Sequence, residues 1–184
     1  MKKGWIVVIA IIVILLLIGI SKYNTFVKMK VEIDNAWAEI DNQLKRRYDL
    51  IPNYVETVKG YAKHEKEVFT EVTKARASVG KATTREETIN ANNELTGALS
   101  RLLLVVERYP ELKANTNFIR LQDELAGTEN RLAVSRRRYN ESVKIYNQKI
   151  VVFPNNIIAG MFGFTKEVFF EIQKAEKETP KVKF

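Results

Sequence analysis

The side chains best suited to catalysis or metal binding are few in this chain, and they are not spaced for a familiar site. Helices rich in Glu suit a di-iron centre, but that centre takes a Glu-x-x-His motif from each of two helices. The chain has a single histidine, His64, and the residue three positions before it is Tyr61. Zinc sites with several His ligands are disfavoured for the same reason, and a Ser-His-Asp triad would need His64. The glycine pair at 160–163 lacks the lysine and the preceding strand of a phosphate-binding loop. We therefore expect no enzymatic activity, no cofactor and no metal.

The charge pattern also argues against nucleic-acid binding. Lys and Arg outnumber Asp and Glu by 30 to 22, and the two signs are mixed along the chain. The basic runs at 45–47 and 136–138 are suggestive, but three consecutive residues of a helix spread over roughly 200° and form no single stripe. A basic domain attached to an anionic bilayer accounts for the charge more simply. The chain has no Cys, which excludes disulfides and thiolate metal sites.

The N-terminal segment has the composition of a membrane anchor. Residues 4–20 contain no charged side chain. Seventeen helical residues cover roughly 25 Å, which suffices for the hydrocarbon core if Lys2, Lys3 and Lys22 extend toward the head groups. The alternative is a cleaved signal peptide, which is disfavoured because the apolar run is long and no small-x-small site follows it. Lys2 and Lys3 favour a cytoplasmic N-terminus, whereas Lys22, Lys28 and Lys30 oppose it, so the orientation stays undecided.

Almost all of the remaining sequence has helical periodicity, which predicts an all-α fold with an up-and-down bundle behind the anchor. The clearest seam runs from Phe118 to Phe153 in alternating steps of three and four. Thr84 with Glu87 forms a capping-box pattern that begins a helix over 86–108, and Pro110 ends it.

The count of helices depends on Pro52. If the chain turns there, with Asn53 as the N-cap of a second helix, four helices follow near 24–50, 53–78, 86–108 and 116–150. The second would end at Gly80. The alternative is one kinked helix, because the heptad phase continues through Pro52 without a slip. We favour the turn. The fourth helix then returns to the bilayer, beside the segment that follows it.

The C-terminal segment differs from the rest. Residues 151–164 are apolar and broken by Pro154 and two glycines, and a short helix is expected near 165–178. The segment either caps the bundle or contacts the membrane interface. The candidate interface residues are Phe153, Phe162, Phe164, Phe169 and Phe170. The sequence thus divides into an anchor (1–21), a helical bundle (22–152) and a Phe-rich segment with a basic tail (153–184).

Polar residues occupy seam positions where apolar ones belong, Arg47 and Glu65 among them. They either fix the register of the helices by pairing, for example Arg47 with Glu65 across the turn, or line a recognition groove. We favour pairing.

Several short segments make the chain resemble the LemA family of bacterial membrane proteins. They are RRYDLIPN (46–53), GYAKHE (60–65), ARA (75–77), ERYPELKAN (107–115), LQDEL (121–125), TENR (128–131), RRYN (137–140), YN (146–147), FPN (153–155) and IA (158–159). The resemblance implies a bundle of long helices behind one N-terminal span, with turns at Pro52, Pro110 and Pro154. It implies no catalytic residues, and some relatives are connected with membrane remodelling around magnetosomes. The candidate interhelix or partner-binding residues are Arg47, Glu65, Arg76, Glu107, Glu124, Glu129 and Arg138.

These features predict a non-enzymatic, membrane-anchored scaffold or adaptor of the bacterial cell envelope, in a single pass through the cytoplasmic membrane. The expected partners are the lipid bilayer and either other proteins or further copies of the chain. The alternatives are an oligomerising module that organises or remodels the membrane and an enzyme of unrecognised type.

Overall fold

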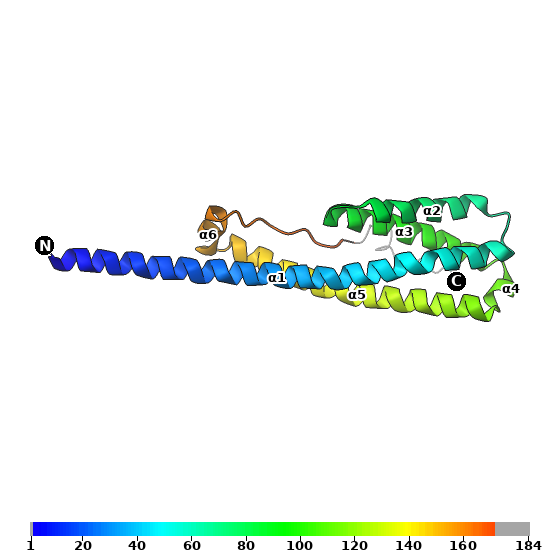
Figure 1. Ribbon diagram of the computed structural model, residues 1–184, viewed down its shortest axis with the longest axis horizontal. Helices are drawn as coiled ribbons and strands as arrows, with labels where there is room; N and C mark the ends of the chain where they lie inside the picture. The colour runs from blue at the N-terminus through cyan, green and yellow to red at the C-terminus, as the bar shows by residue number, and fades with distance from the viewer. Residues whose placement is uncertain (1, 172–184) are drawn as a thin grey trace, which may run out of the picture. The chain divides into compact units, whose positions relative to one another are not determined.

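The computed structural model describes residues 2–171, and every regular element in that range is an α-helix. The elements are α1 (Lys2–Tyr61), α2 (Lys66–Lys81), α3 (Arg85–Val106), α4 (Pro110–Lys113), α5 (Thr116–Val151) and α6 (Asn155–Met161) (Figure 1). The predicted all-α fold is confirmed. Residues 164–171 form no helix, so the short helix expected near 165–178 is wrong over this part. Its remainder and the basic tail lie outside the described residues.

The helices contribute to two compact units. The first unit combines the chain up to Ala38 with Arg137–Phe169, and the second combines Glu39–Arg136 with the residues from Phe170 onward. Hydropathy divides the sequence into the segments 1–21, 22–152 and 153–184, whereas these two units are defined by packing.

The second unit is an antiparallel bundle of the last part of α1, α2, α3 and the first part of α5. Contacts that pair Tyr48 with Arg76 and Lys59 with Phe69 show that α1 and α2 run in opposite directions. Its core is aliphatic and aromatic, with the ring of Tyr54 packed 5.2 Å from that of Phe118. The predicted up-and-down arrangement is therefore present. The core residues include Ile51, Val55, Val58, Val72, Leu95, Leu99, Leu102, Val106 and Leu112.

The predicted turn at Pro52 is wrong. α1 continues through Pro52 to Tyr61, and the chain turns instead at residues 62–65 (Figure 1). The uninterrupted heptad explains this, because Ile51, Val55 and Val58 on one face of α1 are all buried in the core. Asn53 lies exposed inside the helix and caps nothing.

A proline inside a helix leaves the carbonyl four residues earlier without its N–H donor. Here that carbonyl belongs to Tyr48, and the Nε of Arg76 on α2 donates to it at 3.1 Å. The Arg76 guanidinium also lies 3.8 Å above the centre of the Tyr48 ring. The packing of α2 therefore replaces the hydrogen bond that Pro52 removes, and no turn is required.

Gly80 does not end α2, because the helix continues to Lys81. A Cβ on Gly80 would lie 3.3 Å from the Tyr48 hydroxyl, which is tighter than ordinary contact. The glycine therefore allows α2 to approach the Tyr48 ring closely, and it does not terminate the helix.

The other predicted helix ends are present. Thr84 and Glu87 form the capping box of α3, in which the Glu87 N–H donates to Thr84 Oγ1 at 3.2 Å and the Thr84 N–H donates to Glu87 Oε2 at 3.2 Å. The Thr83 N–H also donates to Glu87 Oε2, at 2.8 Å. α3 ends at Val106, and Pro110 occupies the first turn of α4, where its missing N–H costs nothing.

This capping box predicts a pH-dependent start of α3. The hydrogen bonds from Thr83 and Thr84 hold the pKa of the Glu87 carboxyl below its ordinary value of 4.5. A lowered pKa in the folded state contributes stability that is present above the ordinary pKa and lost as the pH falls through the folded pKa. We expect Thr84→Ala to lower the free energy of unfolding by about 0.5–2 kcal/mol at neutral pH. Glu87→Gln should flatten the acid side of the stability profile, as measured by denaturant titration followed by circular dichroism. An unchanged acid profile in Glu87→Gln would contradict the assignment.

The first unit contains the start of α1, the end of α5, α6 and an extended segment at 164–169, which we call the strap. Irregular backbone needs partners for its polar groups, and α5 supplies them. Tyr146 donates to the Thr165 carbonyl at 3.0 Å, and Tyr139 donates to the Val168 carbonyl at 2.9 Å. These tyrosines, which form part of the RRYN and YN segments, thus hold the strap.

Asn147 pairs with Glu167 of the strap in both directions. Its Nδ2 donates to the Glu167 carbonyl at 2.8 Å, and its Oδ1 accepts from the Glu167 N–H at 2.9 Å. The Glu167 carboxylate lies 2.9 Å from Lys30 Nζ on α1, and this hydrogen bond raises the pKa of Lys30. The strap is therefore tied to both long helices of the first unit.

Candidate functional site

A buried polar cluster crosses the core of the second unit. Arg47 of α1 is 4 % exposed, and its Nη1 donates to Asn92 Oδ1 at 3.2 Å and to Thr96 Oγ1 at 3.0 Å, both on α3. The same nitrogen lies 3.0 Å from Glu129 Oε2 on α5. Arg136, 9 % exposed, pairs with Glu129 Oε1 at 2.6 Å. The cluster therefore links α1, α3 and α5.

Glu129 is the centre of this cluster. Two guanidinium groups share one carboxylate, and the Glu129 side chain keeps 37 % of its surface exposed. The guanidinium of Arg136 also lies 5.4 Å from the centre of the Phe170 ring, which adds a cation–π contact. Arg47 contacts side chains of both α3 and α5, so the arrangement suits register specification between helices.

The structure separates the other predicted polar residues. The suggested pair of Arg47 with Glu65 is wrong: Arg47 contacts Glu129, and Glu65 pairs with Arg108 at 2.9 Å. With α1 unbroken at Pro52, the helix continues for about four turns beyond Arg47 before it reaches the turn that contains Glu65, so the two cannot meet.

The remaining candidates lie at the surface. Glu124 pairs with Arg46 at 2.8 Å, and this contact lowers the pKa of the Glu124 carboxyl. Glu107 pairs with Lys113 at 2.7 Å beside the α3–α4 connection. Arg138 is exposed on α5. Glu124 and Glu107 therefore lie outside the buried cluster.

Sequence reasoning missed three members of the cluster, Asn92, Thr96 and Arg136. Each carried a detectable signal. Asn92 lies three residues after Ile89 and three before Leu95, on the apolar face of α3, and Thr96 lies one turn further along. Arg136 lies one heptad after Glu129 and therefore on the same face of α5.

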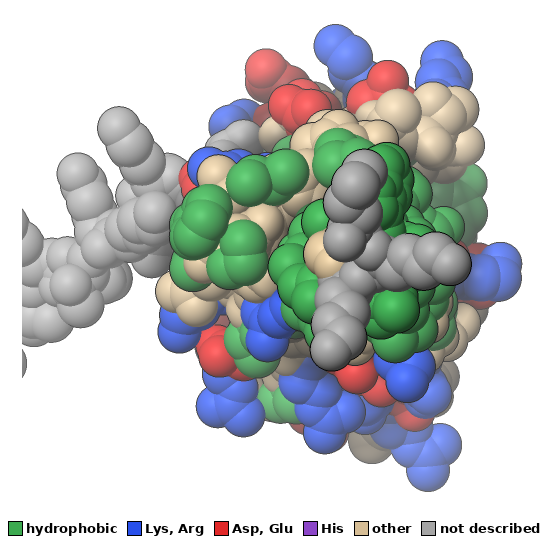
Figure 2. Space-filling view, turned by 90° about the vertical axis from the view of Figure 1, so that its left-hand side faces the viewer, with side chains coloured by type: hydrophobic (Ala, Val, Ile, Leu, Met, Phe, Trp, Pro, Cys, Tyr) green, Lys and Arg blue, Asp and Glu red, His purple; other side chains and the backbone are tan. Residues whose placement is uncertain are grey.

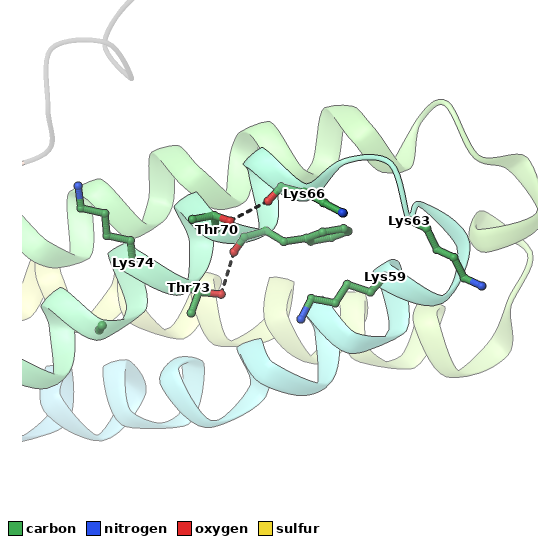
Figure 3. A pocket seen from close by; sticks show the side chains of 8 residues that line it. Lys59, Lys63, Lys66, Thr70, Thr73 and Lys74 are labelled. Carbon is green, nitrogen blue, oxygen red and sulfur yellow. Dashed lines mark hydrogen bonds between the residues drawn. The ribbon is translucent and has the colours of Figure 1, made fainter.

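A second feature of the second unit is a surface groove between the end of α1 and α2, with a volume of about 790 Å³ (Figure 3). We call it the lysine groove. Its lining residues are Lys59, Lys63, Lys66, Phe69, Thr70, Thr73, Lys74 and Ala77.

The groove combines an apolar lining with a cationic rim. The hydroxyls of Thr70 and Thr73 donate to carbonyls of their own helix, at 2.9 and 2.8 Å. Lys59 pairs with Glu56 at 2.6 Å. Within residues 2–171, no hydrogen bond or ion pair involves the ammonium groups of Lys63, Lys66 and Lys74. No acidic residue is among the lining residues.

The predicted interface residues flank α6 or lie in or just after the strap. Phe153 and Phe162 are exposed, Phe164 is half-buried and Phe169 is exposed. Phe170, in contrast, is buried against Arg136 and is not available at a surface.

α1 carries one apolar stretch of membrane-spanning length near its start, and its side chains from Gly4 to Ile18 are exposed. Within the described residues no group of three or more His, Asp and Glu side chains is placed to hold a metal ion. An exposed apolar helix that continues into a helical bundle defines the class: a membrane protein with a helical domain behind one candidate span.

The comparisons with known proteins name the family. The LemA family model matches residues 36–184, and the chain belongs to the LemA family. "Magnetosome protein MamQ 2" of Paramagnetospirillum magneticum is 25% identical over 187 residues, covering 88% of this chain and 68% of the relative. "Protein LemA" of Metamycoplasma hominis is 22% identical over 159 residues, covering 86% of this chain and 73% of the relative.

Proposed function

We propose that this protein is a non-enzymatic adaptor of the bacterial cytoplasmic membrane, held by a single pass of α1, and that it binds an acidic, amphipathic helix of a protein partner in the lysine groove. The observation that carries the proposal is the groove itself, an apolar lining between α1 and α2 bordered by four lysines (Figure 3).

Charge complementarity selects the occupant. An amphipathic helix that lies in a groove buries its apolar face and leaves its polar face at the rim. Rim lysines without ion partners favour carboxylates on that face, and they increase the association rate more than the affinity. The chain's own C-terminal tail is a poor occupant, because residues 172–184 contain four lysines and two glutamates.

The proposal predicts salt-sensitive binding of a designed peptide. The probe is a synthetic helix with Leu at i, i+3, i+4 and i+7 and Glu elsewhere, titrated into the detergent-solubilised full-length protein and followed by fluorescence anisotropy. Lys63→Glu/Lys66→Glu should weaken binding about tenfold, because two rim pairs are lost and replaced by repulsion.

Two controls make the measurement specific. A matched peptide with Lys in place of Glu should not bind, and Arg120→Glu/Arg137→Glu, two exposed positions on α5, should leave the affinity unchanged. Equal binding of both peptides, or equal weakening by both double variants, would contradict a groove that recognises acidic helices.

A second candidate function is self-association that organises the membrane. Leu103 and Leu104 of α3 are exposed beside the buried seam residue Leu102. Three of the relatives carry the name magnetosome protein. This candidate requires copies of the chain to meet at α3, so a cysteine at position 104 should form a disulfide between copies in native membranes.

A further inference from the structure

We propose that α6 and the residues flanking it form a second membrane contact, in which an apolar face of this short helix sits among the lipid head groups beside the span of α1. This inference rests on the membrane anchoring proposed above and adds a lipid-binding surface formed by residues far from the anchor in sequence.

The first observation is the composition of the α6 surface. Residues 151–165 contain no charged side chain. Phe153 and Met161 are each 75 % exposed, and Ile157 is also exposed. Ile157 and Met161 are four residues apart, on one face of the helix. The opposite face is packed, with Asn155 and Ala159 buried.

The outward apolar face of α6 and the apolar side chains of α1 together form a patch that is larger than scattered surface residues. Figure 2 looks at the end of the first unit where α1 begins, and apolar side chains gather there over α6 and over α1. Contiguous apolar patches of this kind mark membrane or protein contacts.

The second observation is the position of this patch along α1. The ring of Phe162 lies 5.0 Å from that of Tyr23, and the ring of Phe164 lies 5.6 Å from Tyr23 and 5.2 Å from Phe26. Tyr23 follows the last residue of the apolar segment, Ile20, by three residues, or about 4.5 Å of helix. Gly19 is the first residue of that segment to be partly covered.

These contacts place the patch at the depth of the interface. The head-group layers on each side of a bilayer extend several Å beyond the hydrocarbon core, and tyrosines are enriched there. If residues 4–20 occupy the core, Tyr23 and Phe162 occupy the adjacent layer. This continuity with the span selects lipid, rather than water or a second copy of the chain, as the occupant.

The third observation is that α6 is held in a fixed orientation. Its C-terminal end is a Schellman motif, in which the Phe164 N–H donates to the Ala159 carbonyl at 2.9 Å and Gly163 adopts a φ of 71°. At its start, Asn155 Nδ2 donates to the Lys149 carbonyl of α5 at 3.1 Å. The apolar face is therefore presented by a defined structure.

The test uses the absence of native cysteines, which allows single-site labelling of the full-length protein. Met161→Cys carries an environment-sensitive fluorophore in vesicles of phosphatidylethanolamine and phosphatidylglycerol, with a nitroxide quencher either at the head group or deep in the acyl chain. Position 161 should lose most of its fluorescence to the head-group quencher. Ile12→Cys should lose it to the deep quencher, and Val31→Cys, exposed and about 12 Å beyond Tyr23 along α1, should lose little to either.

The outcomes separate this inference from the anchoring. Loss of quenching at position 12 means that the span itself is absent. Quenching at 12 with full fluorescence at 161 overturns the α6 contact alone, and a disulfide between two copies at 161 assigns the patch to a second copy instead.

A paired variant confirms that the apolar face is responsible. With the fluorophore at position 153, Ile157→Glu/Met161→Glu should abolish head-group quenching, whereas Ile157→Leu/Met161→Leu should retain it. Equal quenching in both double variants, with the same circular dichroism, would contradict the proposal.

Discussion

Replacing Glu129 with Gln is expected to lower the free energy of unfolding by about 3–5 kcal/mol, the largest effect of any single polar change in the second unit. Glu129 is the carboxylate that both Arg47 and Arg136 contact, at 3.0 and 2.6 Å. Its loss removes the negative charge that these two buried guanidinium groups share. The measurement is urea unfolding of the detergent-solubilised full-length protein, followed by circular dichroism.

Removing an arginine of the cluster is expected to lower the free energy of unfolding by less than removing its carboxylate. Arg47→Met keeps the apolar stem of the side chain and leaves Glu129 paired with Arg136, so we expect a loss of about 1–3 kcal/mol from the unmet acceptors on α3. The double variant Arg47→Met/Glu129→Gln should be less destabilised than the sum of the two single changes, because one of the stranded charges is gone. Additive effects, or a greater loss from Arg47→Met than from Glu129→Gln, would show that the cluster is not held by its carboxylate.

Arg76→Ala is expected to destabilise the second unit by about 2 kcal/mol. It removes the donor to the Tyr48 carbonyl, which Pro52 leaves without a helical partner, and it removes the cation–π contact with the Tyr48 ring. The same unfolding measurement applies, and Arg76→Lys, which keeps the charge but not the planar stack, should have an intermediate effect.

The control for this explanation is the Pro52→Ala background. Alanine restores an N–H at position 52, so the Tyr48 carbonyl regains a partner within α1. Arg76→Ala should then cost about 1 kcal/mol less than it does beside Pro52. An equal cost in both backgrounds would mean that Arg76 acts only through its stacking.

Local sequence determined the features that depend on near neighbours. The all-α fold and the seam of α5 follow from apolar residues at helical spacing, and the start of α3 follows from Thr84 and Glu87, which contact each other across a single turn. The end of α3 before Pro110 follows from the geometry of proline itself. Each of these signals lies within a few residues, so sequence alone carries it.

Tertiary structure decided the features in which a distant residue supplies a partner. Pro52 stays inside α1 because Arg76, on another helix, donates to the carbonyl that the proline leaves free. Arg47 pairs with Glu129 rather than Glu65 because the chain turns after Tyr61, which changes the residues that face it. The segment after α6 is a strap rather than a helix because tyrosines and an asparagine of α5 bind its backbone. A proline or a polar side chain has the same local preference wherever it lies. Only the packed neighbours determine whether the polar groups that it leaves unpaired find hydrogen-bond or ionic partners.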